Sequence, residues 1–344
     1  MFPRFLNPEE FLQQAAESPV FDVRTPGEFC QAHIPGACNL PLFSNEERHE
    51  IGILYKESGR QAAILRGLEI VGPRLAEYVL LARAVASNEN ILLHCWRGGM
   101  RSESLAWLLD KAGFRVGVLK GGYKAFRRLV IATFAQPLRL LVVGGMTGSG
   151  KTEILKRLGD RGEQVLDLEG LAQHRGSAFG AVGNGEQPSS EQVENEVFAV
   201  LRTFDPSRTI WVEDESRRIG RVLVNELLFR QMRGATVIRI HVPREIRVER
   251  LCREYGREPR ARLAAAVGNI GKRLGGENAA RVLQAIEEGD YRQAAQTILE
   301  YYDKTYLYGI SKRDPATIID LDPTPADPAA IADALIVRAE SLGG

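Results

Sequence analysis

The sequence predicts an α/β protein built from two domains. Apolar segments of strand length alternate with segments of helical character along the chain, which is typical of this fold class. The 344 residues, 44% of them hydrophobic, are enough for two ordinary cores. At Ala135-Gln136-Pro137 a helical segment ends and a new strand begins. We therefore expect a first domain over residues 1–135 and a second over residues 136–344.

Short apolar segments define the sheet of the first domain. The predicted strands are Val20–Val23, Ile91–His94 and Val116–Leu119. Residues 102–112 predict a helix, and Gly113 is expected to cap its C-terminal end. A second predicted helix, over residues 124–134, closes the domain.

The second domain continues the alternation and ends in a helical region. Its predicted strands cover residues 138–143, 164–167, 209–213 and 236–242. Residues 258–306 are expected to be mostly helical, and a late strand at 317–320 precedes a helix at 328–342. This order favours a parallel sheet with a helical C-terminal part.

The composition excludes several classes of protein. The 45 Lys and Arg nearly cancel the 44 Asp and Glu, and the residue mix is neither disordered nor collagen-like. The four cysteines show no CxxC pair and no zinc-finger spacing, so we expect no disulfide framework and no zinc finger. The N-terminus has no signal pattern, and no apolar stretch approaches the ~20 residues of a membrane span. We therefore expect a cytoplasmic protein.

The first candidate site is a cysteine in a loop between a strand and a helix. Backbone N–H groups at the helix start and two nearby arginines are expected to lower the pKa of this thiol, and paired glycines allow the N–H groups to face an anion. The alternative, a buried structural cysteine, requires neither the glycines nor the arginines. The predicted catalytic residues are Cys95, Arg97 and Arg101, and the predicted anion-binding loop contains Trp96, Gly98 and Gly99.

Two known families place a cysteine in such a loop. Rhodanese-like sulfurtransferases usually have an arginine five residues after the cysteine, whereas protein tyrosine phosphatases have the pattern H-C-x5-R. The spacing His94-Cys95-x5-Arg101 resembles the longer loop, which leaves room for a tetrahedral anion of phosphate size. The loop alone leaves the choice between the two families open.

The flanking segments resemble the rhodanese family. Asp22–Phe29, His33–Ala37 and Asn39–Pro41 are similar to its N-terminal signature, and Leu119–Phe126 is similar to its C-terminal signature. The resemblance implies a three-layer rhodanese-like domain. We expect four polar residues of this text to brace loops near the site, and two cysteines to be small core residues. The bracing residues are Asp22, Arg24, Glu28 and His33, and the cysteines are Cys30 and Cys38.

The second candidate site is a phosphate-binding loop. An apolar strand leads into Gly145–Thr152, which has the spacing G-x-x-x-x-G-K-T, and a helical segment follows. Glycines in such a loop let backbone N–H groups wrap a phosphate, while Lys151 neutralises charge and the Thr152 hydroxyl is placed for Mg²⁺. The pattern predicts a bound di- or triphosphate group. The expected phosphate-binding residues are Gly145, Gly148, Ser149, Gly150, Lys151 and Thr152.

Acidic and polar residues after two neighbouring strands are candidates for a second set of contacts. One carboxylate of Glu213, Asp214 or Glu215 is expected near the metal, and we favour Asp214, with Thr152, as the possible Mg²⁺ ligand. Residues after the strand at 164–167 contact substrate in small-molecule kinases, although a solvated loop is the alternative. The candidates there are Asp167, His174 and Arg175.

A basic segment is hidden by the overall neutrality. Between Arg217 and Gly276 there are 15 Lys and Arg but five Asp and Glu. This asymmetry favours a polyanionic partner. A solvated helix face with alternating charges and a lid over a bound phosphate remain alternatives.

A rhodanese-like domain followed by a P-loop domain resembles one family in particular, the bacterial tRNA 2-selenouridine synthases. The similarity extends over nearly the whole chain. It covers His94–Ser102, Leu54–Gly67, Gly145–Thr152, Leu166–Ser177, Trp211–Ser216 and Tyr301–Tyr306.

The resemblance implies a two-step reaction on tRNA that carries 2-thiouridine at the wobble position. Geranyl diphosphate first alkylates the sulfur, and selenium from selenophosphate then replaces the geranylated sulfur. Lys151 and Thr152 would bind the diphosphate together with Mg²⁺, and Cys95 would handle selenium as nucleophile or carrier. An enzyme that makes selenophosphate is then a possible partner. The sequence does not locate the geranyl chain, because a prenyl pocket consists of ordinary apolar side chains.

Three other readings use the same motifs. A sulfurtransferase fused to an ATP-dependent kinase-like module would bind ATP in the P-loop, and a cysteine phosphatase with a nucleotide-binding domain would hydrolyse aryl phosphates. A tRNA-binding scaffold with decayed domains is disfavoured because Cys95 and Lys151 are both intact.

Overall fold

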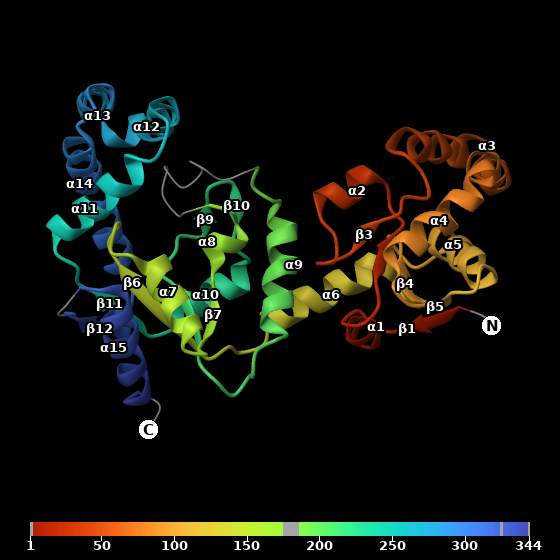
Figure 1. Ribbon diagram of the computed structural model, residues 1–344, viewed down its shortest axis with the longest axis horizontal. Helices are drawn as coiled ribbons and strands as arrows, with labels where there is room; N and C mark the ends of the chain where they lie inside the picture. The colour runs from red at the N-terminus through yellow and green to blue at the C-terminus, as the bar shows by residue number, and fades with distance from the viewer. Residues whose placement is uncertain (1–2, 175–185, 324–325, 343–344) are drawn as a thin grey trace. The chain divides into compact units, whose positions relative to one another are not determined.

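The computed structural model describes residues 3–174, 186–323 and 326–342 (Figure 1). The chain forms two compact units that divide between Thr133 and Phe134, close to the predicted boundary. Among the described residues, no helix is long and apolar enough to cross a bilayer. Each unit contains its own five-stranded sheet and its own core.

Unit 1 is built on a parallel sheet with strand order β1-β5-β4-β2-β3. The three predicted strands are confirmed, and two further strands extend the sheet at its edges. The strands are β1 (Arg4–Leu6), β2 (Val20–Asp22), β3 (Cys38–Asn39), β4 (Asn90–His94) and β5 (Arg115–Leu119). Since the strands are parallel, their carboxyl ends share one edge of the sheet, and this edge carries the segment that follows His94.

Helices cover both faces of this sheet, which confirms the expected three-layer arrangement. One face packs against α4 and α5, with Tyr78, Leu105 and Leu109 in a common core with the strands. The other face holds the buried Phe11 and Phe126 of α1 and α6. The helices are α1 (Pro8–Gln14), α2 (Pro26–Gln31), α3 (Asn45–Val71), η1 (Gly72–Arg74), α4 (Leu75–Val85), α5 (Met100–Lys111) and α6 (Gly122–Phe134).

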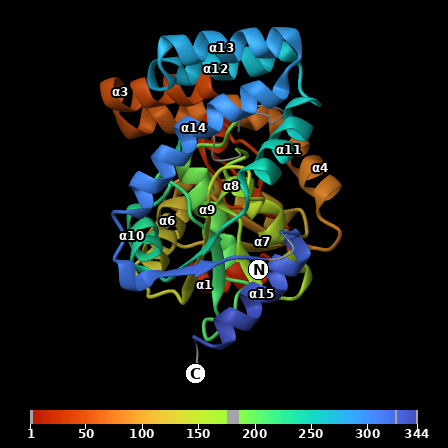
Figure 2. The same ribbon diagram turned by 90° about the vertical axis from the view of Figure 1, so that its left-hand side faces the viewer.

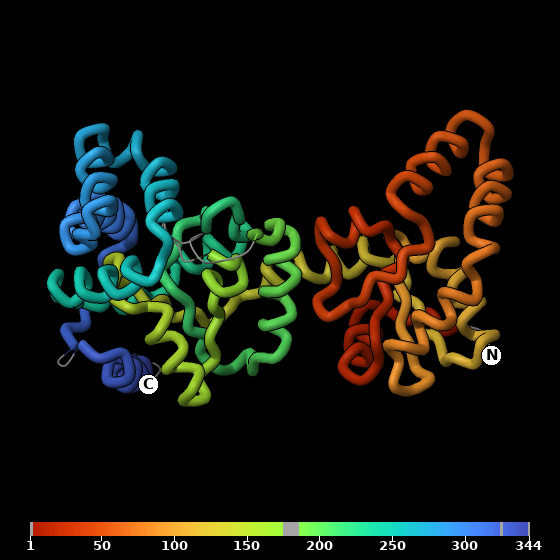
Figure 3. Tube along the Cα trace, turned by 45° about the horizontal axis from the view of Figure 1, so that its top comes forward, coloured from red at the N-terminus to blue at the C-terminus, as the bar shows by residue number. Residues whose placement is uncertain are grey.

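The segment α3 is a hairpin of two helical arms. Gly59 interrupts it with φ 84° and ψ −178°, a conformation that other residues rarely adopt. Gly67 of the second arm faces the Ile51 side chain of the first, since a Cβ at residue 67 would lie 3.9 Å from Ile51 Cδ1. Arg66 also donates a 2.6 Å hydrogen bond to Glu50 across the arms. The trace in Figure 3 shows this reversal of the chain.

Unit 2 contains a second parallel sheet, in the order β12-β11-β6-β8-β7. Helices α7 and α15 pack on one face of the sheet and form an apolar core with its strands. Helices α8, α9 and α10 contribute no residue to that core. The strands are β6 (Leu140–Gly145), β7 (Gln164–Leu166), β8 (Ile210–Glu213), β11 (Val237–Ile240) and β12 (Ile318–Leu321), with a separate hairpin β9 (Arg218–Ile219) and β10 (Val222–Leu223). The helices are α7 (Lys151–Asp160), α8 (Leu168–Leu171), α9 (Ser190–Leu201), α10 (Glu226–Gly234) and α15 (Pro328–Glu340), with η2 (Pro315–Thr317) before β12.

The predicted helical region forms a lobe with its own core. Apolar side chains such as Val267, Ile286 and Ile298 are fully or nearly fully buried between its helices. Figure 2 shows α12 and α13 side by side with α14 next to them. The lobe consists of α11 (Arg244–Tyr255), α12 (Arg260–Leu274), α13 (Gly276–Glu288) and α14 (Tyr291–Ile310).

Two candidate active sites

Cys95 follows β4 directly, and its sulfur lies among hydrogen-bond donors of the loop. Ser102 Oγ donates to Cys95 Sγ over 3.2 Å, and the Gly99 backbone N–H donates to it over 3.4 Å. Gly99 is also the residue that precedes α5, so the sulfur faces the start of that helix. Such donors favour a negative charge on sulfur.

The glycines of the loop permit a close approach to the segment that starts α6. Gly98 has φ +67°, and a Cβ there would lie 2.7 Å from the Leu119 carbonyl oxygen. Gly122 has φ +60°, and a Cβ there would lie 2.4 Å from the Cys95 carbonyl oxygen. The Tyr123 N–H donates to that same carbonyl over 2.8 Å. The C-terminal signature therefore holds the Cys95 loop in shape.

The two predicted arginines of the loop have different surroundings. Arg101 Nη1 donates to Glu28 Oε2 over 2.8 Å, so its charge is already paired with a carboxylate. Arg97 and Trp96 are exposed. Of the two cations, Arg97 is therefore the one more available to an incoming anion.

Polar residues of the N-terminal signature brace the site, as expected. Asp22 and Arg24 form a fully buried ion pair at 2.6 Å, and the Arg24 guanidinium lies 3.9 Å from the Tyr123 ring centroid. The prediction for Cys30 and Cys38 is wrong, because both side chains are exposed. Cys30 lies in the short helix α2, none of whose residues is buried, and Cys38 lies in the edge strand β3.

The electrostatics of the loop favour a reactive sulfur. Burial alone would raise the pKa of Cys95, but the Ser102 hydroxyl and the N–H groups of Gly99 and Arg97 outweigh burial and lower this pKa below its ordinary value. Burial lowers the pKa of His94 to about 4 despite the nearby Asp22 carboxylate. The imidazole is thus neutral at pH 7, and the loop donors rather than a histidine cation stabilise the thiolate.

Removing the Ser102 hydroxyl should make Cys95 a weaker acid. Because a hydrogen bond to a charged group contributes ~1.5–3 kcal/mol, we expect Ser102→Ala to raise the pKa of Cys95 by about one unit or more. The rate of Cys95 alkylation by iodoacetamide, measured against pH, reports this value. Ser104→Ala, an exposed residue outside the sulfur's hydrogen bonds, is the control. An unshifted alkylation profile in Ser102→Ala would contradict the assignment.

The P-loop connects β6 to α7 in the expected strand–loop–helix order. Gly148 and Gly150 have φ of +80° and +85°, which explains glycine at both positions. Lys151 Nζ donates to the Gly145 carbonyl oxygen over 3.0 Å, so the ammonium lies over the loop. Ser149 Oγ is buried without a hydrogen-bond partner among the described residues.

Two arginines of the basic segment support this loop rather than an external partner. Arg247 is buried, forms a two-bond ion pair with Asp303 and donates to the Thr147 carbonyl over 3.1 Å. Arg250 donates to the Ser149 carbonyl and the Ala326 carbonyl. Part of the positive charge that predicts a polyanionic partner thus has a structural use in shaping the P-loop.

The carboxylate that contacts the P-loop is Glu169, not the favoured Asp214. Thr152 Oγ1 donates to Glu169 Oε2 over 3.0 Å, and the Glu169 N–H donates to Glu213 Oε1 over 2.9 Å. Asp214 instead accepts a 2.7 Å hydrogen bond from Arg313. Because an arginine already holds Asp214, the geometry favours Glu169 as the carboxylate beside Thr152.

Glu169, Glu213 and Glu215 form a crowded group of carboxyls. Burial raises the pKa of Glu213 well above its usual range, and the carboxyls of Glu169 and Glu215 add to this effect. One oxygen of Glu213, Oε2, is buried without a hydrogen-bond partner among the described residues. Burial and mutual repulsion therefore favour the protonated form of carboxyls in this group.

The stability of unit 2 should fall as the pH rises from about 4.5 to 8. Burial, opposed by Lys151 and reinforced by Glu169, raises the pKa of Glu215 from 4.5 to about 8. In that window the folded state keeps a proton that the unfolded state releases, so a higher pH favours unfolding. Glu215→Gln should flatten the decline. Calorimetric melting temperatures between pH 5 and 8.5 test this, and an equally steep decline in the variant would contradict it.

The remaining predicted residues have other surroundings or lie outside the described chain. Asp167 caps α8, since its Oδ1 accepts a 2.7 Å hydrogen bond from the Gly170 N–H. His174 is buried beside Gly220, where a Cβ would lie 2.6 Å from His174 Cδ2, and burial lowers the pKa of this histidine. Arg175 lies outside the described residues. A capping role explains Asp167 without any substrate.

Each of the two units matches a known protein family. Residues 138–324 match the family described as tRNA 2-selenouridine synthase AAA domain, and residues 7–129 match the rhodanese-like domain family. A crystal structure of the N-terminal domain of a protein from Clostridium difficile 630, named for ATP/GTP binding, is 41% identical. It covers 37% of this chain and 98% of that chain, with a TM-score of 0.34.

Full-length relatives share one name. The tRNA 2-selenouridine synthase of Psychromonas ingrahamii is 34% identical over 330 residues, which cover 86% of this chain and 89% of the relative. That of Bordetella bronchiseptica is 36% identical over 329 residues, which cover 85% and 88%. With both units matched and most of each relative's length covered, the chain belongs to the family of tRNA 2-selenouridine synthases.

Proposed function

We propose that the enzyme converts 2-thiouridine at the tRNA wobble position into 2-selenouridine in two steps, one at each site. The observation that carries this proposal is the presence, in one chain of this family, of a Cys95 sulfur that accepts hydrogen bonds from Ser102 and Gly99 and of an intact P-loop at Gly145–Thr152. A tRNA substrate places the reaction in the cytoplasm. Selenophosphate is the selenium donor, and an enzyme that makes it must supply this substrate.

The first step takes place at the P-loop with geranyl diphosphate. The 2-thio sulfur attacks C1 of the geranyl group, so a carbon–sulfur bond forms, the carbon–oxygen bond breaks and pyrophosphate leaves. The N3 proton of the base is released to solvent as the C2–N3 double bond forms. The loop N–H groups and Lys151 bind the diphosphate and stabilise the charge of the leaving group. Thr152 and Glu169 are the residues that would hold Mg²⁺, which supplies further charge neutralisation when bound.

S-alkylation prepares the base for the second step. In 2-thiouridine the sulfur is double-bonded to C2 as a thiocarbonyl, and it is a poor leaving group. After alkylation the sulfur is a thioether on an electrophilic carbon, and it departs as geranylthiol. Each step therefore needs a separate binding site, one for a diphosphate and one for a sulfur or selenium nucleophile.

The second step takes place at Cys95 as two displacements. The Cys95 thiolate attacks C2 and geranylthiolate leaves; the selenium of selenophosphate then attacks C2 and releases Cys95. Water cleaves the selenium–phosphorus bond, which yields phosphate and the selenocarbonyl. This sequence is redox neutral. A selenopersulfide on Cys95 would require a two-electron oxidant, so the nucleophile role is favoured over the carrier role.

Exposed cations on the helical lobe support contact with the tRNA backbone. They lie on α11, on α12 and in the segment between them, and they remain after the arginines that brace the P-loop are set aside. Lys and Arg in such positions bind phosphates without reading sequence. They are Arg253, Arg257, Arg262, Lys272 and Arg273.

The test uses tRNA that carries wobble 2-thiouridine, with nucleosides identified by mass spectrometry. With geranyl diphosphate alone we expect S-geranyl-2-thiouridine, and with selenophosphate added we expect 2-selenouridine. Absence of the geranyl adduct together with ATP hydrolysis would instead favour a kinase-linked sulfurtransferase. Hydrolysis of an aryl phosphate without change in the tRNA would favour a phosphatase.

A further inference from the structure

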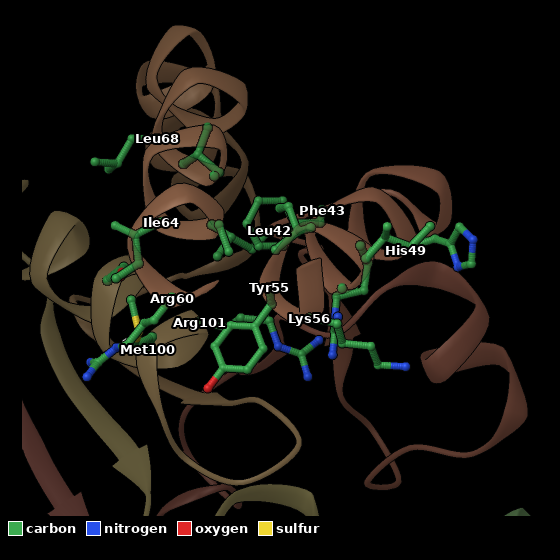
Figure 4. Close-up of a pocket in the computed structure, with 18 of the residues that line it drawn as sticks. Leu42, Phe43, His49, Tyr55, Lys56, Arg60, Ile64, Leu68, Met100 and Arg101 are labelled. Atoms are coloured by element: carbon green, nitrogen blue, oxygen red, sulfur yellow. Dashed lines mark hydrogen bonds between the residues drawn. The ribbon is translucent and has the colours of Figure 1, made fainter. Parts of the chain in front are cut away.

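Unit 1 contains a cavity of about 1060 Å³ beside the α3 hairpin (Figure 4). Its wall is mostly apolar and comes from both arms of the hairpin and from the loop before it. The main apolar lining residues are Leu42, Phe43, Ile51, Tyr55, Ile64 and Leu68. A volume of this size is at the upper end of those that bind drug-sized molecules.

The cavity is adjacent to the Cys95 loop. Met100 and Arg101, the first two residues of α5, line it. Gly99, the residue before them, donates its N–H to the Cys95 sulfur. Arg60, at the turn of the hairpin, donates to Met100 Sδ over 3.9 Å, so the tip of α3 meets the start of α5. The cavity wall therefore includes the two residues that directly follow Gly99, a hydrogen-bond donor to the Cys95 sulfur.

Large apolar side chains around the cavity are unusually exposed. Tyr55 and Leu68 are 58% and 63% exposed, and Met100 is 47% exposed. A patch of large exposed apolar side chains on a protein surface commonly marks a binding site. The lining also contains the cations Arg48, Lys56 and Arg60, together with Arg101, whose charge is paired with Glu28.

This combination fits a ligand with a hydrocarbon part and an anionic part. A nucleotide alone is polar and would leave the apolar wall unused, whereas a hydrocarbon chain alone would leave the cations unused. A prenylated nucleotide within an RNA satisfies both, since its chain is apolar and its backbone carries phosphates.

We infer that this cavity holds the ten-carbon chain of the S-geranyl base during the second step, so that C2 is presented to Cys95. The inference rests on the proposed function, in which the geranylated sulfur is the group displaced there. Hydrophobic burial strengthens binding ~4-fold for each methylene group, so a geranyl chain gives a far larger effect than a methyl group. The cavity also receives the departing geranylthiol.

The test compares two tRNA substrates supplied ready-made to the full-length enzyme with selenophosphate. One carries S-geranyl-2-thiouridine, and the other carries S-methyl-2-thiouridine, whose short group does not reach the cavity. We expect kcat/KM for selenation to be at least ~100-fold higher for the geranyl substrate, because several methylene groups are buried. Equal values for the two substrates would overturn the inference.

A filled cavity provides the matching variant test. Ile64→Trp places a larger side chain at the lining, whereas Leu65→Trp, at the next position, adds the same group at a residue that is 61% exposed and outside the lining. We expect Ile64→Trp to reduce selenation of the geranyl substrate ~10-fold or more, with little change for the methyl substrate. Leu65→Trp should leave both unchanged. Equal loss for both substrates in Ile64→Trp would overturn the inference.

A direct binding measurement on the wild-type enzyme tests the cavity without relying on enzymatic activity or on the folding of the Ile64→Trp variant. Titration calorimetry should show that the wild-type enzyme binds the nucleoside S-geranyl-2-thiouridine. The Cys95→Ala variant should bind this nucleoside equally well, whereas the wild-type enzyme should not bind S-methyl-2-thiouridine. Binding of geranyl diphosphate that Ile64→Trp abolishes would reassign the cavity to the first step. Failure of the wild-type enzyme to geranylate tRNA would contradict the proposed function, whereas equal use of the geranyl and methyl substrates contradicts the cavity assignment alone.

Discussion

Replacement of Cys95 by alanine should stop the reaction after the first step. Without the thiolate the displacement at C2 loses its nucleophile, and we expect selenation to fall by at least ~1000-fold. The P-loop lies in the other unit and is unchanged, so S-geranyl-2-thiouridine should accumulate at the normal rate. Mass spectrometry of the tRNA nucleosides measures both quantities in one reaction.

The remaining cysteines of unit 1 provide the control for this prediction. Cys30 and Cys38 are exposed, so Cys30→Ala and Cys38→Ala should leave both steps intact. Selenation by Cys95→Ala at a rate near that of the wild type would exclude a nucleophilic role for Cys95. A melting temperature close to that of the wild type shows that the loss is chemical rather than structural.

Replacement of Lys151 by alanine should stop the first step. The ammonium lies over the P-loop, 3.0 Å from the Gly145 carbonyl oxygen, where it can bind a diphosphate. Loss of such a charged donor to a leaving group costs about 100- to 1000-fold in rate, or ~3–4 kcal/mol of activation free energy. The rate of S-geranyl-2-thiouridine formation from geranyl diphosphate measures this effect.

A second lysine in the same helix separates a specific effect from a general loss of charge. Lys156 is exposed on α7 and lies outside the phosphate-binding loop, so Lys156→Ala should geranylate normally. An equal loss of geranylation in the two variants would indicate that Lys151 acts only through the overall charge. Normal geranylation by Lys151→Ala would exclude the P-loop as the diphosphate site.

Much of the fold could be predicted because the central strands are short apolar runs followed by glycine-rich loops. Val20, Phe21 and residues 91–93 are buried and apolar, and such runs show clearly in a sequence. The edge strands β1 and β3 are absent from the prediction because they lack a buried apolar run: two of the three β1 residues are exposed, and neither β3 residue is buried. The α3 hairpin is also absent from the prediction, since its 27 residues include a single buried one, Ala63, and no buried apolar stripe.

The sites were predictable where the chemistry depends on adjacent residues. The Cys95 loop and Gly145–Thr152 are continuous in the sequence, so their glycines and charged residues could be interpreted together. The contact of Glu169 with Thr152 depends on the pairing of β7 with β8 and of β8 with β6, which the sequence does not state. Likewise, Arg247 contacts the P-loop from a helix about 100 residues later in the chain. Such contacts require the folded structure.

If the two steps use two independent sites, a variant that has lost the first step still performs the second. Lys151→Ala is supplied with tRNA that already carries S-geranyl-2-thiouridine, together with selenophosphate. We expect 2-selenouridine to form at the wild-type rate, because the Cys95 site receives its substrate without the first step. Loss of selenation in this reaction would show that the P-loop takes part in the second step and would contradict the separation of the two sites.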